Sequence, residues 1–363
     1  MDIATYNQME RLGQSRLSAW RHQQIFSPIA FDQVGFPARI DHIGQVRGLL
    51  SGMHDWRRIP FTISELDGLR EEDLGRIGKA VATYLKWFRS CFPDEVVPVP
   101  LGDILAYYLA YLKLSGLDRR SRVLEIGPGY GHLALFLYGD EAVQKYDMIE
   151  ITQSLYVIQA SLCAFCYGEG FRNAALSDDA PARVGSLGDS SSATGGYRPY
   201  SLSMPRSFNC TLYPWWELDQ PLSGEYDVIV SNSNIVEMSR GAFHYYLENW
   251  KNVLTDSGYV LIQDIGHSVH RSGDEAMKAL DKHGYRALAK FEGPVEQKHV
   301  YMWNLVLVTE RHPEYERAKS VLEPRVLLTD NPVVRKVFGL DRPPGKKMAA
   351  RDILQHVASK LSR

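Results

Sequence analysis

The stretch that most constrains this chain is residues 122–138, RVLEIGPGYGHLALFLY. Val123, Leu124 and Ile126 form a short apolar run of strand type, three glycines interrupt it, and an apolar run of helix length follows. The pattern predicts a strand, a tight loop and a helix. Glycine has no Cβ and tolerates a positive φ, so such a loop brings bare backbone and a helix N-terminus close to a ligand.

Two nucleotide-like cofactors bind to a loop of this kind. Dinucleotide-binding proteins carry G-x-G-x-x-G, in which the third glycine lets the helix pack closely on the strand. His132 occupies that third position here, which disfavours a pyrophosphate ligand. The residues match E-x-G-x-G-x-G instead, with Glu125 two positions before the first glycine. A glycine-rich turn in some other α/β protein is the alternative interpretation.

The E-x-G-x-G-x-G segment resembles the first motif of class I S-adenosylmethionine (SAM) methyltransferases. The resemblance implies SAM as cofactor and S-adenosylhomocysteine (SAH) as product, and a carboxylate suits SAM because it carries an ammonium and a sulfonium but no phosphate. Glu150 lies near the end of the next predicted strand, YDMIEI, where the family has an acid that accepts from the ribose hydroxyls. The cofactor contacts implied for these two segments are Glu125, Gly127, Pro128, Gly129, Tyr130, Gly131, Glu150 and Ile151.

Length, charge and cysteine content limit the number of domains, the kind of partner and the cellular compartment that are expected. The chain has 363 residues, a formal charge of −2 and 45% hydrophobic residues, which indicates two domains or one domain with a sizeable extension. A near-neutral charge without a Lys/Arg-rich block argues against nucleic acid as a partner. No apolar run reaches bilayer length and the N-terminus has no signal-peptide core, so a cytoplasmic protein is expected. Four cysteines are too few for a disulfide scaffold.

The regions before and after the central pattern are predicted to be helical. Residues 1–116 contain two segments of helical spacing, 75–92 and 101–116, and the second is apolar nearly all round. This N-terminal region is interpreted as a substrate lid, a homodimer contact or a structural cap. Residues 311–363 form a charged tail that ends in one amphipathic helix, ARDILQHVASKL.

Between these regions, residues 117–310 alternate strand and helix patterns, which predicts a doubly wound, mostly parallel α/β sheet. A short Gly-Pro-containing link joins the last two strands, so they should form an antiparallel hairpin. This arrangement resembles the seven-stranded methyltransferase sheet. The Gly/Ser-rich insert 173–207 is predicted to be a mobile loop, either an active-site lid or a surface loop. The predicted strands are 122–126, 146–151, 208–213, 226–232, 258–265, 285–291 and 299–309.

A second informative segment follows the predicted strand 226–232. In open parallel sheets ligands bind at the carboxyl ends of the strands, so Ser231, Asn232 and Asn234 are expected near the cofactor's methyl group. The run S-N-I-V-E-M-S and the aromatic helix after it resemble the N-S-F-x-E-M-P segment of the putative sugar O-methyltransferase family, with serine in place of that proline. EIGPGYG and IEITQSLYVIQ resemble the matching parts of the same family.

Methyl transfer to a hydroxyl requires in-line placement of the acceptor and removal of its proton. Glu237 in the S-N-I-V-E-M-S segment is the first candidate for the base, against a helix N-terminal acid as the alternative. His267 and His270 lie beyond the fifth strand and titrate near neutrality, and Asp264 at its end could orient such a histidine. His244 is a candidate for the substrate side, although a packing role is the more common one.

Two tryptophans and two cysteines are further candidates for binding residues. Trp215 follows the third strand, where the family places adenine contacts, and Trp216 could stack on a sugar face; packing would explain both equally. Cys163 and Cys166 have C-x-x-C spacing but lie in a helical apolar run without a second pair, which disfavours a metal site. No acid cluster indicates a divalent metal, although some sugar methyltransferases use magnesium.

The sequence therefore predicts a SAM-dependent O-methyltransferase that acts on a sugar or another specialised-metabolite small molecule. Asn234, His244 and Trp216 are the predicted substrate contacts. Two alternatives stay open: methylation of a small-molecule or peptide nitrogen, and a SAM- or SAH-binding scaffold without turnover.

Overall fold

The centre of the computed structural model is a mixed β-sheet with the order β10-β7-β8-β6-β5-β1-β2-β4-β3, in which β9 also pairs with β7. The structure describes residues 3–16, 39–42, 44–52, 58–176, 209–217, 225–235, 238, 240–265, 273–294 and 301–361. Five strands that alternate with helical segments along the chain run parallel, as the sequence predicts. They are β4 (Asn209–Pro214), β2 (Lys145–Glu150), β1 (Arg122–Ile126), β5 (Tyr226–Asn232) and β6 (Leu254–Ile265).

The two predicted closing strands form an antiparallel pair. β7 (Arg286–Pro294) pairs with β8 (Tyr301–Val308), and β8 pairs antiparallel with β6. The expected number of seven strands is wrong, because the described part of the chain forms a ten-stranded sheet. Segments of two or three residues carry no periodic pattern, so the sequence does not indicate them. These additions are β3 (Phe171–Asn173), β9 (Lys319–Ser320) and β10 (Val326–Leu327).

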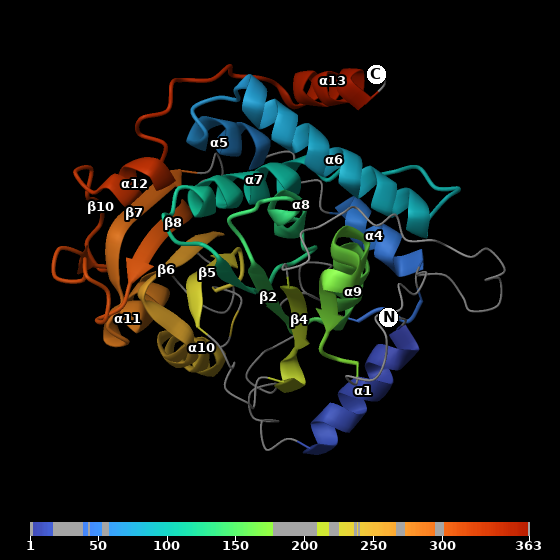
Figure 1. The fold of residues 1–363 in the computed structure, drawn as a ribbon, viewed down its shortest axis with the longest axis horizontal. Coiled ribbons are helices and arrows are strands. Elements are labelled where there is room, and N and C mark those ends of the chain that lie inside the picture. The colour runs from blue at the N-terminus through green and yellow to red at the C-terminus, as the bar shows by residue number, and fades with distance from the viewer. Residues whose placement is uncertain are drawn as a thin grey trace.

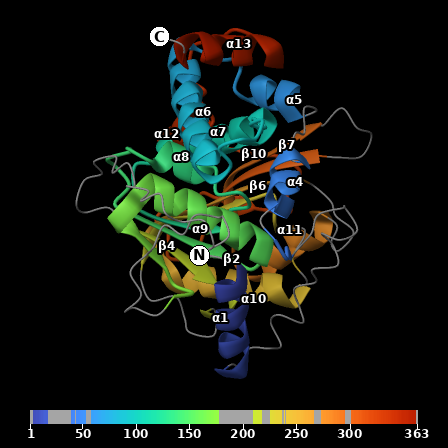
Figure 2. The ribbon, with the colours of Figure 1, turned by 90° about the vertical axis from the view of Figure 1, so that its right-hand side faces the viewer.

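Helices cover both faces of the sheet, which confirms the doubly wound prediction (Figures 1 and 2). Side chains of β1 alternate between the faces: Val123 belongs to one apolar cluster, and Leu124 and Ile126 to the other. The Val123 face packs against α7 (Leu101–Ser115), α8 (Leu133–Leu137) and α9 (Gln153–Tyr167). The opposite face packs against α10 (Arg240–Val253) and α11 (Gly273–Lys282).

The N-terminal region packs onto the Val123 face as an outer layer of helices. Its longest helix, α6, spans the segment predicted to be helical and shares the apolar cluster of α7 and α9. The Trp87 indole on α6 donates to the Ser161 hydroxyl on α9 at 3.0 Å. This layer consists of α1 (Ile3–Arg16), α4 (Gly44–Gly52), α5 (Arg58–Glu65) and α6 (Glu71–Cys91).

The C-terminal segment returns to this helical layer. After α12 (Pro332–Val337) the chain passes α5 and ends in α13 (Ala350–Leu361), which lies beside α6 in both views (Figures 1 and 2). The helix 350–361 predicted from the sequence is therefore present. At the crossing, the backbones of Leu69 and Lys346 exchange hydrogen bonds of 2.9 Å.

Gly68 allows the two backbone segments to approach each other closely at this crossing. Its φ is +83°, and an added Cβ would lie 2.5 Å from the carbonyl carbon of Gly345. We expect Gly68→Ala to lower the free energy of unfolding by at least about 2 kcal/mol, through left-handed strain and backbone overlap. Gly75→Ala is the control, because a Cβ at that position in α6 meets nothing within 4 Å; it should stabilise the helix by about 0.5–1 kcal/mol. Urea unfolding of both variants tests this, and an unchanged midpoint for Gly68→Ala would contradict it.

Candidate functional site

The direction of the chain connections reverses next to β1. β2 lies on one side of β1 and β5 on the other, both parallel to it. The helices that follow β1 and β5, α8 and α10, lie on opposite faces of the sheet, so a ligand-binding crevice is expected at the carboxyl ends of these two strands. In open α/β sheets this switch point is where ligands bind.

The loop after β1 has the conformation that its glycines allow. Gly127, Gly129 and Gly131 have φ values of +61°, +58° and +75°. The Gly127 N–H donates to the Ile149 carbonyl on β2 at 2.9 Å, and the Gly131 N–H donates to the Pro128 carbonyl at 2.8 Å. Residues with a Cβ disfavour this left-handed region, so the three glycines fix the course of the loop.

The loop after β5 reaches across to this glycine loop. The Asn234 side-chain amide donates to the Ile126 carbonyl and, at 3.4 Å, to the Gly127 carbonyl. The Ser231 hydroxyl donates a hydrogen bond of 2.6 Å to the side-chain oxygen of Asn234. Asn232 is the last residue of β5 and lies opposite Gln263 of β6. Ser231, Asn232 and Asn234 thus lie at the edge where the sequence places them.

Glu125 lies on β1 directly before the glycine loop and is fully buried. The Tyr146 hydroxyl donates to its Oε2 atom, whereas its Oε1 atom has no hydrogen-bond partner among the described residues. Burial, together with the nearby Glu150 and Asp103, raises the pKa of Glu125 to about 8, and the hydrogen bond from Tyr146 opposes this rise. A buried carboxyl group with an unpaired oxygen favours a ligand that brings a positive charge or a hydrogen-bond donor.

Glu150 is the last residue of β2, and residues close to it in the chain donate hydrogen bonds to its carboxylate. Its Oε1 accepts from the backbone N–H groups of Ile151 at 2.9 Å and Thr152 at 2.8 Å, and its Oε2 accepts from the Gln159 amide at 3.0 Å. Burial raises the pKa of Glu150 to about 7, against the lowering effect of these bonds. The Gln159 amide also donates to the Gly129 carbonyl, and the Gln159 Oε1 atom is buried without a partner in the described structure. Gln159 therefore links the second acid to the glycine loop.

Helix α7 supports the glycine loop from outside the sheet. The Tyr107 hydroxyl donates to the Pro128 carbonyl at 2.7 Å, and Asp103 contacts the His132 ring nitrogen Nδ1 at 2.5 Å. Both Asp103 and His132 are buried. Asp103, Tyr107 and Gln159 are not among the site residues predicted from the sequence. Charged or amide side chains in helices that are otherwise apolar were the available signal, because a buried polar group needs a partner.

Tyr130 points away from the crevice. Its hydroxyl donates to the Leu49 carbonyl on α4 at 3.2 Å, and its ring stacks on His132 with centroids 5.9 Å apart. The tyrosine thus fixes the N-terminal layer on the glycine loop.

The two tryptophans after β4 pack against the N-terminal layer. The Trp215 indole donates to Glu10 on α1 at 2.9 Å, and the Trp216 ring lies 5.2 Å from that of Tyr6. Both tryptophans are buried. Their contacts in this structure therefore agree with a packing role, which is one of the two interpretations that the sequence allows. His244 lies on α10, where its Nδ1 is 2.8 Å from Nε2 of His283, and α10 begins at Arg240.

The candidate catalytic residues fall largely outside the described structure. Glu237, His267 and His270 are not among the described residues, and Asp264 is described only through its backbone, at the end of β6. Most of the predicted insert 173–207 also lies outside. Within the described ranges, no three His, Cys, Asp or Glu side chains gather as a metal site, and no helix is long and apolar enough to span a membrane.

No family model matches the chain, and no curated protein matches it. Similar solved structures include magnesium protoporphyrin IX methyltransferase from Synechocystis PCC 6803 with bound SAM, at 12% identity and a TM-score of 0.36 over 67% of this chain and 99% of that chain. The N-methyltransferase NodS from Bradyrhizobium japonicum WM9 with SAH is 11% identical, with a TM-score of 0.36 over 63% and 99%. The [4+2]-cyclase SpnF is 14% identical, with a TM-score of 0.36 over 58% and 82%. At these values the function of this chain must be argued from its own residues.

The raised pKa of Glu125 gives a testable pH dependence. The carboxyl group titrates near 4.5 when unfolded and near 8 when folded, so between these values the folded state binds more protons and stability falls as pH rises. Glu125→Gln removes this titration. The difference in midpoint temperature between the variant and the unmodified protein should therefore shift in favour of the variant as pH rises from 4.5 to 8. The shift should correspond to on the order of 2 kcal/mol in the free energy of unfolding. Exposed Glu141→Gln is the control for thermal unfolding, and a difference independent of pH would contradict the assignment.

Proposed function

We propose that the chain binds SAM in the crevice between β1 and β5 and transfers its methyl group to a small-molecule acceptor. The observation that carries the proposal is the pair of buried acceptor atoms beside the glycine loop, Glu125 Oε1 and Gln159 Oε1, which have no donor among the described residues. A cationic ligand suits such a site, whereas a diphosphate would add negative charge next to Glu125 and Glu150.

The residues present fit the cofactor. Glu125 and the glycine loop would face the methionine part, whose ammonium supplies the positive charge and the donors that the unpaired oxygens lack. Glu150 already accepts from the Ile151 backbone, the Thr152 backbone and side chain, and the Gln159 amide, so a ribose hydroxyl would displace one of these donors, such as the Gln159 amide. Asn234 would border the methyl group from the β5 side.

When bound, SAM supplies a methyl group that its sulfonium already activates. Transfer to an acceptor hydroxyl would form an oxygen–methyl bond in place of the carbon–sulfur bond, with SAH as the product. The chain's task is to hold the acceptor in line and to take its proton. We assign proton removal to Glu237, with His267 or His270, oriented by Asp264, as the alternative.

The acceptor in this proposal is a hydroxyl of a sugar or of another specialised metabolite. The resemblance of S-N-I-V-E-M-S to the sugar O-methyltransferase segment supports it. A nitrogen acceptor would depend less on a base, because an amine attacks once it is neutral.

Calorimetric titration with SAM, SAH and NAD tests the cofactor first. Micromolar binding of SAM or SAH is expected, and binding of NAD alone would overturn the proposal. A labelled-methyl assay with sugars and amines, with and without magnesium, then tests turnover. Binding without methyl transfer to any acceptor would favour the scaffold alternative.

A further inference from the structure

A second cavity lies away from the glycine loop, between α6, α7 and the chain around α12. Its volume is about 400 Å³, which falls within the range of small-molecule sites. It extends to Ser115 and Gly116 at the end of α7, whereas Asp103 and Tyr107, nearer the start of that helix, hold the glycine loop. The cavity is thus separate from the proposed cofactor site.

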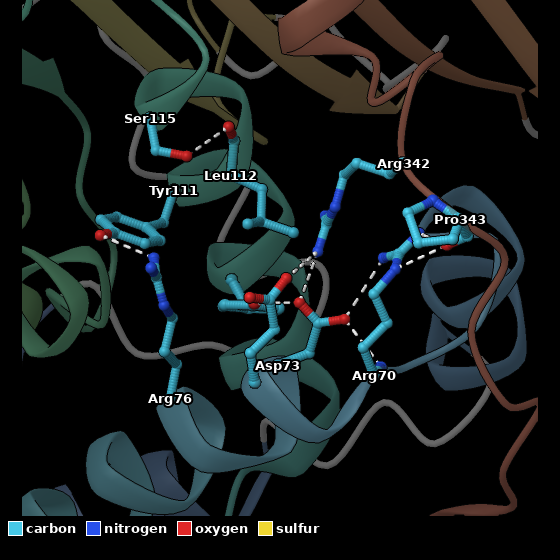
Figure 3. A network of polar contacts seen from close by, with 10 residues as sticks. Arg70, Asp73, Arg76, Tyr111, Leu112, Ser115, Arg342 and Pro343 are labelled. Carbon is cyan, nitrogen blue, oxygen red and sulfur yellow. Dashed lines mark hydrogen bonds and ion pairs between the residues drawn. The ribbon is translucent and has the colours of Figure 1, made fainter.

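One wall of the cavity is a pair of arginines that share a single carboxylate. Figure 3 shows Asp73 of α6 between Arg70 and Arg342, with a contact of 3.4 Å to Arg70 Nη1 and one of 2.7 Å to Arg342 Nη2. Burial would raise the pKa of Asp73, but hydrogen bonds from the Tyr108 hydroxyl, the Arg70 backbone N–H and Arg342 outweigh it and lower the pKa. Arg70 also donates to the Pro343 carbonyl at 2.6 Å. The ionised Asp73 therefore orients both guanidinium groups, and Glu72 lies 3.5 Å from Arg342 as a second carboxylate partner.

Arg76 adds a third guanidinium from the next turn of α6. It donates to the Tyr111 hydroxyl at 3.1 Å and lies 5.6 Å from the centre of that ring (Figure 3). Arg76 is exposed and forms no ion pair with any described residue. Its remaining donors are therefore available to a ligand.

The rest of the lining is partly apolar. The apolar part of the lining includes Leu109 and Leu112 of α7, Val337 at the end of α12 and Phe338 directly after it. The described lining also holds five arginine and lysine side chains besides the buried Lys113, and four acidic ones. Arg335 pairs with Asp341 and Lys336 with Asp118, which leaves Arg76 without a carboxylate partner among the described residues. Arginine binds carboxylate and phosphate groups through its planar fork of donors.

We propose that this cavity binds an organic anion, with a carboxylate or phosphate group on Arg76 and Arg342 and an apolar body against Leu112 and Phe338. The proposal does not depend on the function assigned to the crevice. It predicts selectivity for ligands that combine both parts.

The test uses the full chain and four probes: phenyl phosphate, benzoate, phenol and inorganic phosphate, measured by calorimetry and ligand-observed NMR. Phenyl phosphate or benzoate should bind at least about tenfold more tightly than phenol, because a charge-assisted hydrogen bond contributes that much. The stronger of the two identifies the anionic group. Equal binding of phenol and both anions, or no binding of either anion, would overturn the proposal.

Two variants locate the site without disturbing the Asp73 ion pairs. Arg76→Gln removes the guanidinium that has no carboxylate partner, and Ser115→Trp fills the cavity without changing charge. Each should weaken binding of the tighter anion at least about tenfold, while SAM binding stays unchanged. Arg351→Gln on the exposed side of α13 is the control for net charge and should bind like the unmodified protein. Undiminished binding by both cavity variants would place the anion elsewhere and end the proposal.

Discussion

Replacing Gly129 with arginine should abolish SAM binding. Gly129 has a φ of +58°, and an added Cβ would lie 3.1 Å from the Tyr107 hydroxyl, which itself holds the Pro128 carbonyl. An arginine side chain would fill the loop and bring a cation toward a ligand that is itself cationic. We expect the dissociation constant measured by calorimetry to rise by at least about a hundredfold, from steric exclusion and like-charge repulsion together.

Gly139→Arg is the matched control for this substitution. Its φ is +83°, so it introduces comparable left-handed strain and the same charge, but a Cβ there meets nothing within 4 Å. Both variants should lose stability to a similar extent through this strain, and only Gly129→Arg should lose SAM. Tight SAM binding by Gly129→Arg would remove the glycine loop from the proposed site.

The sheet and its ligand-binding edge were predictable because they depend on strong local patterns. Buried parallel strands require continuous apolar runs such as Val228–Val230, and glycines are required where the chain turns with positive φ. Once the strands are parallel, their carboxyl ends share an edge. The contact between Asn234 and Gly127, which are far apart in the chain, follows from that topology alone.

The partners of buried polar groups were not predictable, because they depend on how layers meet. Lys113 on α7 donates to Gln263 on β6 at 2.9 Å and also to Asn304 on β8, and burial lowers its pKa to about 7. The sequence shows that such a lysine needs partners but not which strands supply them. Trp215 and Trp216 illustrate the same limit, because their packing on α1 depends on where a distant helix docks.

Replacing Glu237 with glutamine should separate binding from chemistry. Glutamine keeps the size and the hydrogen-bonding capacity of the side chain but cannot take a proton at neutral pH. SAM affinity should therefore stay unchanged, while the rate of methyl transfer to a hydroxyl acceptor should fall by about 10²–10⁴-fold, the usual contribution of a general base.

The same variant also distinguishes the type of acceptor. With an amine acceptor the loss should largely vanish at a pH where the amine is already neutral, whereas with a hydroxyl acceptor it should persist across the pH range in which the base is ionised. Glu248→Gln, an exposed position on α10, is the control for lost negative charge and should retain full activity. If Glu237→Gln transfers methyl groups at the unmodified rate, Glu237 is not the base, and substitutions at His267 and His270 become the decisive measurements.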